Sequence, residues 1–238
     1  MNETVHTIPL PNLFLTFVPV FIIISIFYIW NLDWKNKVYG FTRMLLQLFL
    51  VGSILKYIFK TNNLYFTVIM LLLMLFLASW ISLRINPSER NSLLVYSFFS
   101  ILLGAGFSLI IVIKFILRIE PWFLPKYVIP IAGMLLSSSM NGISLAYDRI
   151  SSELSKSNAY DSAKKIALEA SLIPNTNTLF AVGIVSLPGM MTGQILSGVE
   201  PILAVRYQIM IISTLFASAG ISSAFFLYII KNKLRKKF

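Results

Sequence analysis

The stretch SLPGMMTGQI, Ser186 to Ile195, decides how the rest of this chain is interpreted. It lies in an apolar segment, residues 176–196, that is long enough to cross a bilayer, since a spanning helix needs about 20 mostly apolar residues. Yet it contains a proline, two glycines, a threonine and a glutamine. Because a proline removes a backbone hydrogen bond, we expect Pro188 to kink or interrupt the helix, and Gly189 beside it to free the backbone further.

The composition places the chain in a membrane. Of its 238 residues, 57% are hydrophobic and only 12% are charged, which is too apolar for an ordinary soluble domain. Unpaired backbone groups are costly in hydrocarbon, so the sequence predicts an all-α, polytopic protein with one transmembrane domain, residues 1–238. About seven segments qualify as spans: residues 12–30, 41–59, 64–83, 92–117, 124–147, 176–196 and 203–230.

The distribution of basic residues predicts the orientation. The start, MNETVHTIPLPN, has no Lys or Arg, so the first span is expected to be retained rather than cleaved as a signal peptide. Most Lys and Arg residues fall in loops on the side of the C-terminus, which predicts an outer N-terminus and a cytoplasmic C-terminus. The net charge of +11 is scattered over these loops, so it indicates topology and contact with anionic lipid rather than nucleic-acid binding.

The longest polar segment, residues 148–175, is expected to be a cytoplasmic loop that contains one helix. Asp161 is a candidate cap, Lys165 and Glu169 are four residues apart, and Pro174 is expected to end the helix. Its predicted apolar face carries Ile166, Ala170 and Ile173. This pattern suits docking of a peripheral protein and lying in the membrane interface equally well. The candidate docking residues are Arg149, Glu153, Lys164, Lys165 and Glu169.

Polar residues inside spans are candidate sites, because they are costly unless they face protein or water. The candidates in the spans are Arg43, Gln47, Asn141 and Gln208. Arg43 and Gln47 share a helix face, and Arg43 is expected to anchor at the headgroups. Asn141 is expected to find a partner across the helix bundle, while the serines and the glycine around it permit close helix packing.

Two interpretations of the opening stretch remain open. Gly189 and Gly193 form a GxxxG pair, which is typical of a tight packing notch between helices. A broken helix whose freed carbonyls line a transport path is the other interpretation. The residues of the predicted path or hinge are Pro188, Gly189, Met190, Met191, Thr192, Gly193 and Gln194.

Metal binding and catalysis by this chain are not predicted. Methionine thioethers bind soft ions, but methionine is also a common apolar filler, and no His, Cys and carboxylate cluster accompanies Met190 and Met191. A hydrolase would have to recruit His6, the single histidine. The chain has no GxxxxGK[ST] motif, so any nucleotide hydrolysis is expected in another subunit. A permease fits better than a hydrolase or a membrane scaffold protein.

Three blocks resemble the FetB-type permeases, the membrane subunits of a small class of ABC transporters. VGIVSLPGMMTGQILSGVEPILAVRYQIMI, Val182 to Ile211, is similar to the signature region of that family. RMLLQLFLVGSILKYIF, Arg43 to Phe59, resembles its second-span motif, and VIPIAGMLLSSSMNGISLAYDRI, Val128 to Ile150, resembles its fifth-span block. The stretch Tyr147 to Pro174 is shorter than in the family and lacks its Leu-Gly-Ala-Thr-like turn.

The resemblance implies a partner and a cargo. A separate ATP-binding subunit would carry ATP-Mg, with no cofactor bound by this chain, and two copies of each subunit would form the transporter in the cell (inner or plasma) membrane. Bacterial members are linked to export of iron, which makes iron or another metal the expected cargo. Plant members are linked to aluminium tolerance and to nucleotide sugars, so an organic substrate is the alternative.

Overall fold

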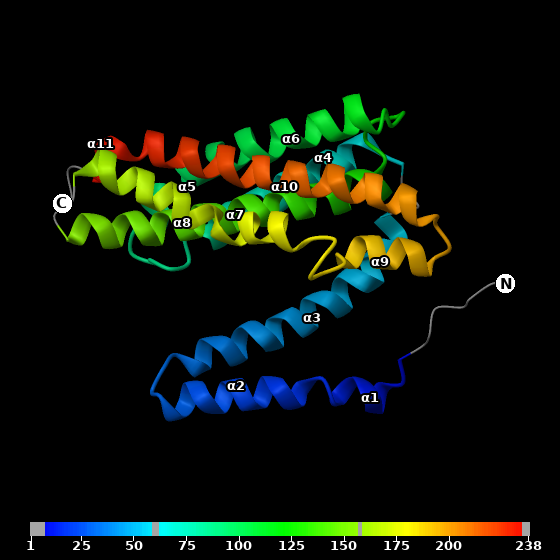
Figure 1. Cartoon of the computed structure of the whole chain (residues 1–238), viewed down its shortest axis with the longest axis horizontal. Coiled ribbons are helices and arrows are strands. Elements are labelled where there is room, and N and C mark those ends of the chain that lie inside the picture. The colour runs from blue at the N-terminus through cyan, green and yellow to red at the C-terminus, as the bar shows by residue number, and fades with distance from the viewer. Residues whose placement is uncertain (1–7, 59–61, 157–158, 235–238) are drawn as a thin grey trace. The chain divides into compact units, whose positions relative to one another are not determined.

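The computed structural model describes residues 8–58, 62–156 and 159–234, and these ranges are helical and contain no strand longer than a single bridge (Figure 1). The prediction of an all-α protein is confirmed. Backbone contacts divide the chain into two compact units, Met1–Thr61 and Asn62–Phe238, and each is described by itself.

The first unit is a helical hairpin. It consists of α1 (Leu10–Phe14), α2 (Phe17–Ile29) and α3 (Trp34–Ile58). The turn between α2 and α3 has Asn31 at a positive φ of 53°, a conformation that Asn tolerates better than most residues. The rings of Phe17 and Phe41 then meet edge to face, with their centroids 5.5 Å apart, and hold the two helices together.

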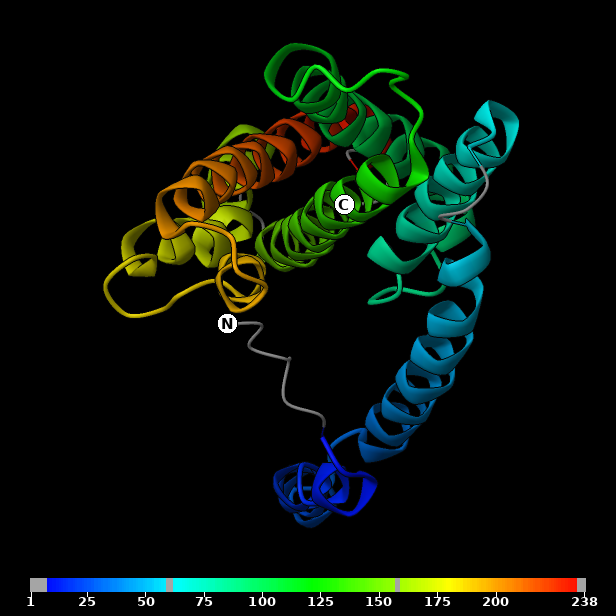
Figure 2. The ribbon, with the colours of Figure 1, turned by 90° about the vertical axis from the view of Figure 1, so that its right-hand side faces the viewer.

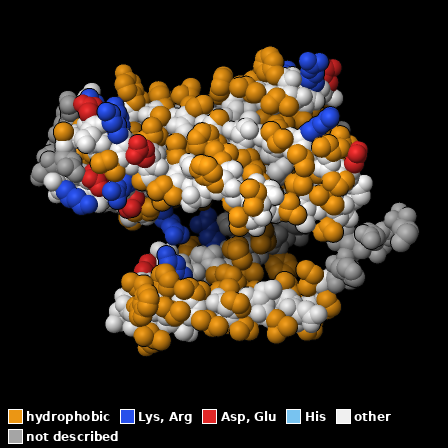
Figure 3. Space-filling model, in the orientation of Figure 1, with side chains coloured by type: hydrophobic (Ala, Val, Ile, Leu, Met, Phe, Trp, Pro, Cys, Tyr) orange, Lys and Arg blue, Asp and Glu red, His pale blue; other side chains and the backbone are white. Residues whose placement is uncertain are grey.

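The second unit holds the remaining helices. They are α4 (Leu64–Ser82), α5 (Arg90–Ile101), η1 (Leu102–Gly106), α6 (Phe107–Ile110), η2 (Ile111–Ile116), α7 (Pro125–Ser155), α8 (Tyr160–Ala181), α9 (Gly189–Leu196), α10 (Pro201–Ile229) and α11 (Lys231–Leu234). The elements from α5 to η2 form one continuous helical rod in which η1 and η2 are π-helical turns. On the face of this unit drawn in Figure 3, charged side chains gather at the two ends and hydrophobic ones cover the surface between.

Five helical segments of the described ranges are long and apolar enough to cross a membrane: Leu10–Ile29, Leu64–Ser82, Arg90–Ile116, Pro125–Ser155 and Pro201–Ile229. They match the first, third, fourth, fifth and seventh expected spans. The second expected span falls in α3. The sixth, residues 176–196, is not one helix, because α8 ends at Ala181 and α9 begins only at Gly189. The expected interruption of this segment is therefore present.

A seam of small residues joins α7 and α10, which run parallel. Ser139 Oγ lies 2.6 Å from Ser218 Oγ, and the rings of Tyr147 and Phe226 meet eight residues further along both helices. All four residues are buried. Because lipid offers no hydrophobic drive for helix association, close packing and hydroxyl hydrogen bonds of this kind hold membrane helices together.

Gly104 brings the π-helical turn η1 against the same seam. A Cβ built on Gly104 would lie 2.6 Å from the backbone oxygen of Ser218 and 2.8 Å from the backbone nitrogen of Ser222, distances that no real methyl group occupies. Only glycine fits, so the approach of this rod to α10 depends on that position. Gly106 differs, since its Cβ would meet only Leu102 Cδ1 at 3.5 Å.

The segment 148–175 is a helical hairpin rather than a loop with one short helix. Helix α7 continues to Ser155, and α8 begins at Tyr160 with Ala159 at its N-cap, so Asp161 lies in the first turn instead of capping it. Pro174 does not end α8, which continues to Ala181. The expected end was wrong because tertiary contacts hold the turn: Asn175 Nδ2 donates to Ser138 Oγ of α7 over 2.9 Å.

The buried face of α8 also differs from the expected one. Its buried residues are Tyr160, Ala163, Ala167 and Ser171, whereas Ile173 of the predicted face is exposed. Small side chains let α8 approach its neighbours closely, and the spacing of three to four residues is that of one helix face. The face of α8 that packs is therefore the one with small side chains, and not the one with the more hydrophobic side chains.

We predict that Gly104→Ala destabilises the second unit by about 1–3 kcal/mol, the usual cost of forcing extra volume into a packed core. The control is Gly106→Ala, two residues away on the same π-helical turn, which has room for the methyl group. Thermal unfolding of both variants in detergent measures the difference. Equal melting temperatures for the two variants would contradict the packing described for η1 and α10.

Candidate functional site

The break between α8 and α9 is a compact loop, Val182 to Pro188. Most of its amides bond locally: Gly183 N donates to Ser186 O over 3.0 Å and Val185 N to Ala181 O over 2.8 Å. Gly183 has a φ of +84°, which side-chain-bearing residues rarely adopt. Pro188, with a φ of −62°, is the N-cap of α9, so it starts the second helix rather than ending the first.

The loop lies beside the first half of α10. Figure 1 shows α8 beginning at the end of the unit where α10 ends, and α9 leading into the start of α10. The loop faces Ile209 and Ile212, which are roughly 12–17 Å from the first residue of α10 at about 1.5 Å per residue. This level lies within α10, which is one of the helices long and apolar enough to cross a membrane. Helices α8 and α9 both pack against α10, with the loop between them.

A pocket of about 320 Å³ lies between the loop and α10. Its walls are mostly apolar, and they include the uncharged polar side chains of Gln208 and Ser213. The lining residues are Val182, Gly183, Leu187, Pro188, Met191, Val205, Gln208, Ile209, Ile212 and Ser213.

Gln208, which lines this pocket, carries a buried hydrogen-bond acceptor. The residue is 7% exposed, and its Oε1 has no hydrogen-bond partner in the described part of the chain. An unsatisfied buried acceptor costs about 1–3 kcal/mol, and native structures contain few of them. Water or a cargo that donates hydrogen bonds, or a cation that binds an amide oxygen, would satisfy this atom.

The structure brings three of the predicted residues together at this pocket: Pro188, Met191 and Gln208. Met190 instead packs against the hydrophobic core of the unit, as an apolar filler does. Thr192 Oγ1 donates to Pro188 O over 3.2 Å within its own helix turn. Gln194 Oε1 is a second buried acceptor without a partner in the described part of the chain.

Gly189 and Gly193 do not form a packing notch within the chain. A Cβ built on either residue meets no atom within 4 Å, and both residues are exposed. The packing interpretation of the GxxxG pair therefore has no neighbour among the described residues.

The other predicted polar residues lie elsewhere. Asn141 is exposed on α7, and no hydrogen bond joins its side chain to another helix among the described residues. Asn175 supplies the amide that crosses the bundle, because its Nδ2 also lies 3.4 Å from Leu215 O of α10. The sequence signal for it was an Asn directly after Pro174 in an apolar stretch. Arg43 and Gln47 lie on α3 in the first unit, with both side chains exposed.

The predicted docking residues lie on the α7–α8 hairpin. Arg149 pairs with Glu153 over 2.9 Å, and Lys164 pairs with Asp161 over 3.6 Å. Lys165 and Glu169 are exposed on α8, and the ion pairs of the described residues do not join them.

Contacts from other helices hold the base of α8 in place. The hydroxyl of Tyr160 donates to Leu227 O of α10, and Lys231 Nζ lies 3.1 Å from Asp161 Oδ1. Asp161 near the N-terminus of α8 is also favoured by the helix dipole.

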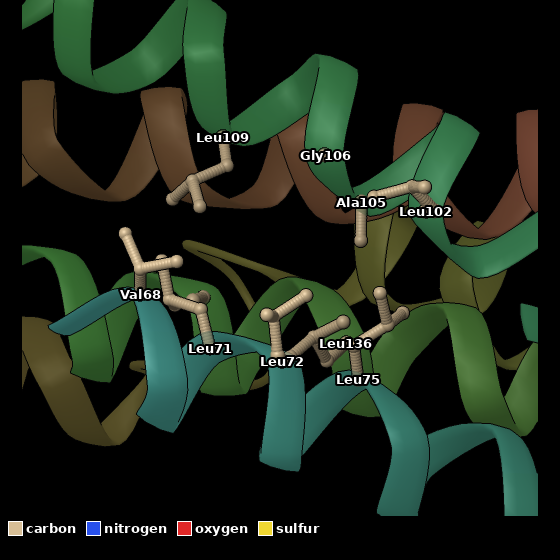
Figure 4. Close-up of a pocket in the computed structure, with 10 residues that line it drawn as sticks. Val68, Leu71, Leu72, Leu75, Leu102, Ala105, Gly106, Leu109 and Leu136 are labelled. Atoms are coloured by element: carbon tan, nitrogen blue, oxygen red, sulfur yellow. The ribbon is translucent and has the colours of Figure 1, made fainter. Parts of the chain in front are cut away.

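The other side-chain clusters and pockets of the second unit offer no stronger site. The described ranges contain no group of three His, Cys, Asp or Glu residues that could hold a metal ion. Another pocket, between α4, η1, α6 and α7, is lined by Leu, Val, Ala and Gly alone (Figure 4). Figure 4 shows its side chains facing one another across the gap, without a polar group for recognition of a polar cargo. The pocket at the break is therefore the candidate site.

We predict that Gln208→Met raises the melting temperature of the detergent-solubilised protein, since an apolar side chain of similar volume removes an unsatisfied acceptor worth about 1 kcal/mol or more. Gln47→Met, at an exposed position, is the control and should leave it unchanged. A lower melting temperature for Gln208→Met would show that the glutamine oxygen has a structural partner.

Comparison with known proteins identifies the family. Residues 10–160 and 155–234 match the family described as "Uncharacterised protein family (UPF0014)". The chain is 33% identical over 218 residues to the "Probable iron export permease protein FetB" of Escherichia coli, covering 84% of this chain and 81% of that protein. It is 28% identical over 223 residues to "Protein ALUMINUM SENSITIVE 3" of Arabidopsis thaliana, covering 87% and 80%.

A membrane protein of Synechocystis, slr1647, is 33% identical over 199 residues, covering 76% of each chain. No solved structure matches this chain. The long matches, together with the apolar helices, establish that this multi-pass membrane protein belongs to the UPF0014 family.

Proposed function

We propose that this chain is the permease subunit of an ABC transporter that exports iron or another metal ion, driven by ATP-Mg in a separate subunit. The observation that carries the proposal is the pocket of about 320 Å³ between the break and α10, which Gln208 and Ser213 line among apolar side chains. The relative named as a probable iron export permease supports the cargo. The chain itself catalyses no reaction in this account and acts in the cell membrane as a homodimer.

The chemistry of the pocket suits passage of a cation rather than its storage. Oxygen atoms of Gln208 and Ser213 and the thioether of Met191 are neutral donors, and no carboxylate lines the pocket. The end of α8 adds the partial negative charge of a helix C-terminus at the break. Neutral ligands partly replace the water that a cation loses on entering the pocket, but they do not bind the cation tightly. A transport path needs such weak binding, because the ion must also leave.

Helix α8 offers a direct mechanical link between ATP hydrolysis and the path. It runs without interruption from the hairpin at Tyr160 to the break at Ala181, a length of about 33 Å at 1.5 Å per residue. We infer that the ATPase docks on residues 148–173, at the end predicted to be cytoplasmic. Its ATP-bound and free states must contact this hairpin differently to bias the permease between inward-facing and outward-facing states.

Shear is the motion that the packing of α8 favours. The small buried residues Ala163, Ala167 and Ser171 allow α8 to slide by small steps against its neighbours. Tyr160 and Asn175, which bond Leu227 O and Ser138 Oγ, hold it at two discrete points. A change in register at these points would move the loop and reshape the pocket beside Gln208.

The test is transport in vesicles that contain this chain and its ATPase partner. We expect ATP-dependent movement of Fe²⁺, and a loss of about tenfold in rate for Gln208→Met if the glutamine contributes about 1.4 kcal/mol to passage of the ion. Gln47→Met is the control and should transport normally. ATP-dependent movement of an organic solute without any metal ion would contradict the proposed cargo, and unchanged transport by Gln208→Met would contradict the proposed path.

A further inference from the structure

Two apolar pockets of the second unit adjoin along the rod that runs from α5 to η2. The first, of about 220 Å³, lies between α4, the rod and α7, and the second, of about 290 Å³, lies between the rod, α7 and the side chain of Trp122. Leu109 lines both pockets, so they follow one another along the rod, which Figure 2 shows from another side. Figure 4 shows side chains of α4 facing Ala105 and Leu109 across the first pocket. We call the two pockets together the rod groove.

The rod groove has the length of one hydrocarbon chain. Its lining follows the rod from Leu102 to Lys114, which is roughly 15–18 Å at up to about 1.5 Å per residue. Half of a hydrocarbon layer about 30 Å thick has a similar depth. The segments that wall the groove, Leu64–Ser82, Arg90–Ile116 and Pro125–Ser155, are each long and apolar enough to cross a membrane. The groove therefore suits the acyl chain of a lipid better than a polar cargo.

The two π-helical turns of the rod form walls of the groove. Leu102, Ala105 and Gly106 of η1 line the first pocket, and Ile113 and Lys114 of η2 line the second. Such turns are rare, and they occur frequently at functional sites. The glycine keeps the first pocket open, since a Cβ at that position would meet only a leucine methyl group at 3.5 Å. The irregular parts of the rod thus coincide with the lining of the groove.

The groove ends at a basic side chain. Lys114 is exposed beside Trp122, with its Nζ 5.9 Å from the centre of the indole ring, and the ion pairs of the described residues do not include it. Residues 114–126 contain three basic residues and one acidic residue. Tryptophan and lysine are typical of the level where the membrane meets water. An anionic headgroup would therefore find a charge partner at this end.

We propose that the rod groove binds an anionic phospholipid, with one acyl chain along α6 and the phosphate at Lys114. The chain itself supplies little negative charge for this lysine: residues 1–61 contain two acidic residues against five basic ones, and the whole chain has a net charge of +11. Charge thus favours a phosphate headgroup over the first unit or a second copy. The proposal does not depend on the proposed function.

Native mass spectrometry of the full chain in detergent, with equimolar phosphatidylglycerol and phosphatidylcholine added, tests the proposal. We expect the chain to retain phosphatidylglycerol in preference to phosphatidylcholine. Lys114→Gln should bind phosphatidylglycerol about fivefold more weakly, the usual contribution of one basic residue near an anionic headgroup. Gly106→Leu should weaken retention of both lipids, because its side chain would fill the first pocket.

Matched controls separate the groove from general effects of charge and volume. Lys165 is exposed on α8, and a Cβ built on Gly52 of α3 meets no atom within 4 Å. Lys165→Gln and Gly52→Leu should therefore bind both lipids as the unchanged chain does. Melting temperatures without added lipid show that each variant is folded, and Lys114→Gln alone decides the proposal if Gly106→Leu is not.

Three outcomes would overturn the proposal. One is unchanged binding of phosphatidylglycerol by Lys114→Gln. The others use Leu72, which lines the first pocket and is 53% exposed, in a chain without cysteine. A disulfide within one chain between Leu72→Cys and Leu50→Cys would show that the first unit covers the groove, and a dimer linked through Leu72→Cys alone would show that a second copy does. Because lipid binding is measured without transport, this proposal and the proposed function can fail separately.

Discussion

The need to satisfy every backbone polar group inside the membrane governs this structure. Helices meet that need along most of the chain, and the loop Val182 to Pro188 is where they do not. The loop limits the cost through local hydrogen bonds, such as that from Val185 N to Ala181 O, and through the positive φ of Gly183. The pocket between this loop and α10 is the candidate path.

Tightly packed helices lie beside the loop Val182 to Pro188. The parallel helices α7 and α10 are locked by Ser139 and Ser218, and Gly104 lets the π-helical turn of the neighbouring rod join them. Helix α8 packs on this frame through small residues and two hydrogen-bonded points. We propose that α8 is the helix that shifts against this frame during transport.

The sequence allowed the membrane class, the all-α fold and the interruption near Pro188 to be predicted, because each follows from hydrophobic length and backbone chemistry. The end of α8 could not be predicted, since whether Pro174 breaks a helix depends on the contact of Asn175 with Ser138. Asn141 and Asn175 are equally plausible partners in sequence, and only the packing shows that the first is exposed. The sequence marked Pro188, Met191 and Gln208 as candidates. That they line one pocket depends on how the helices pack, which the sequence does not show.

The central claim is that the pocket at the break is part of a water-accessible path, and the accessibility of Ser213 tests it most directly. Ser213→Cys places a single thiol at the pocket in a chain without cysteine. The account predicts that a charged, membrane-impermeant methanethiosulfonate labels this thiol in intact membranes, and that saturating Fe²⁺ slows the reaction. Labelling by a lipid-soluble maleimide alone, with no reaction of the charged reagent, would contradict the account.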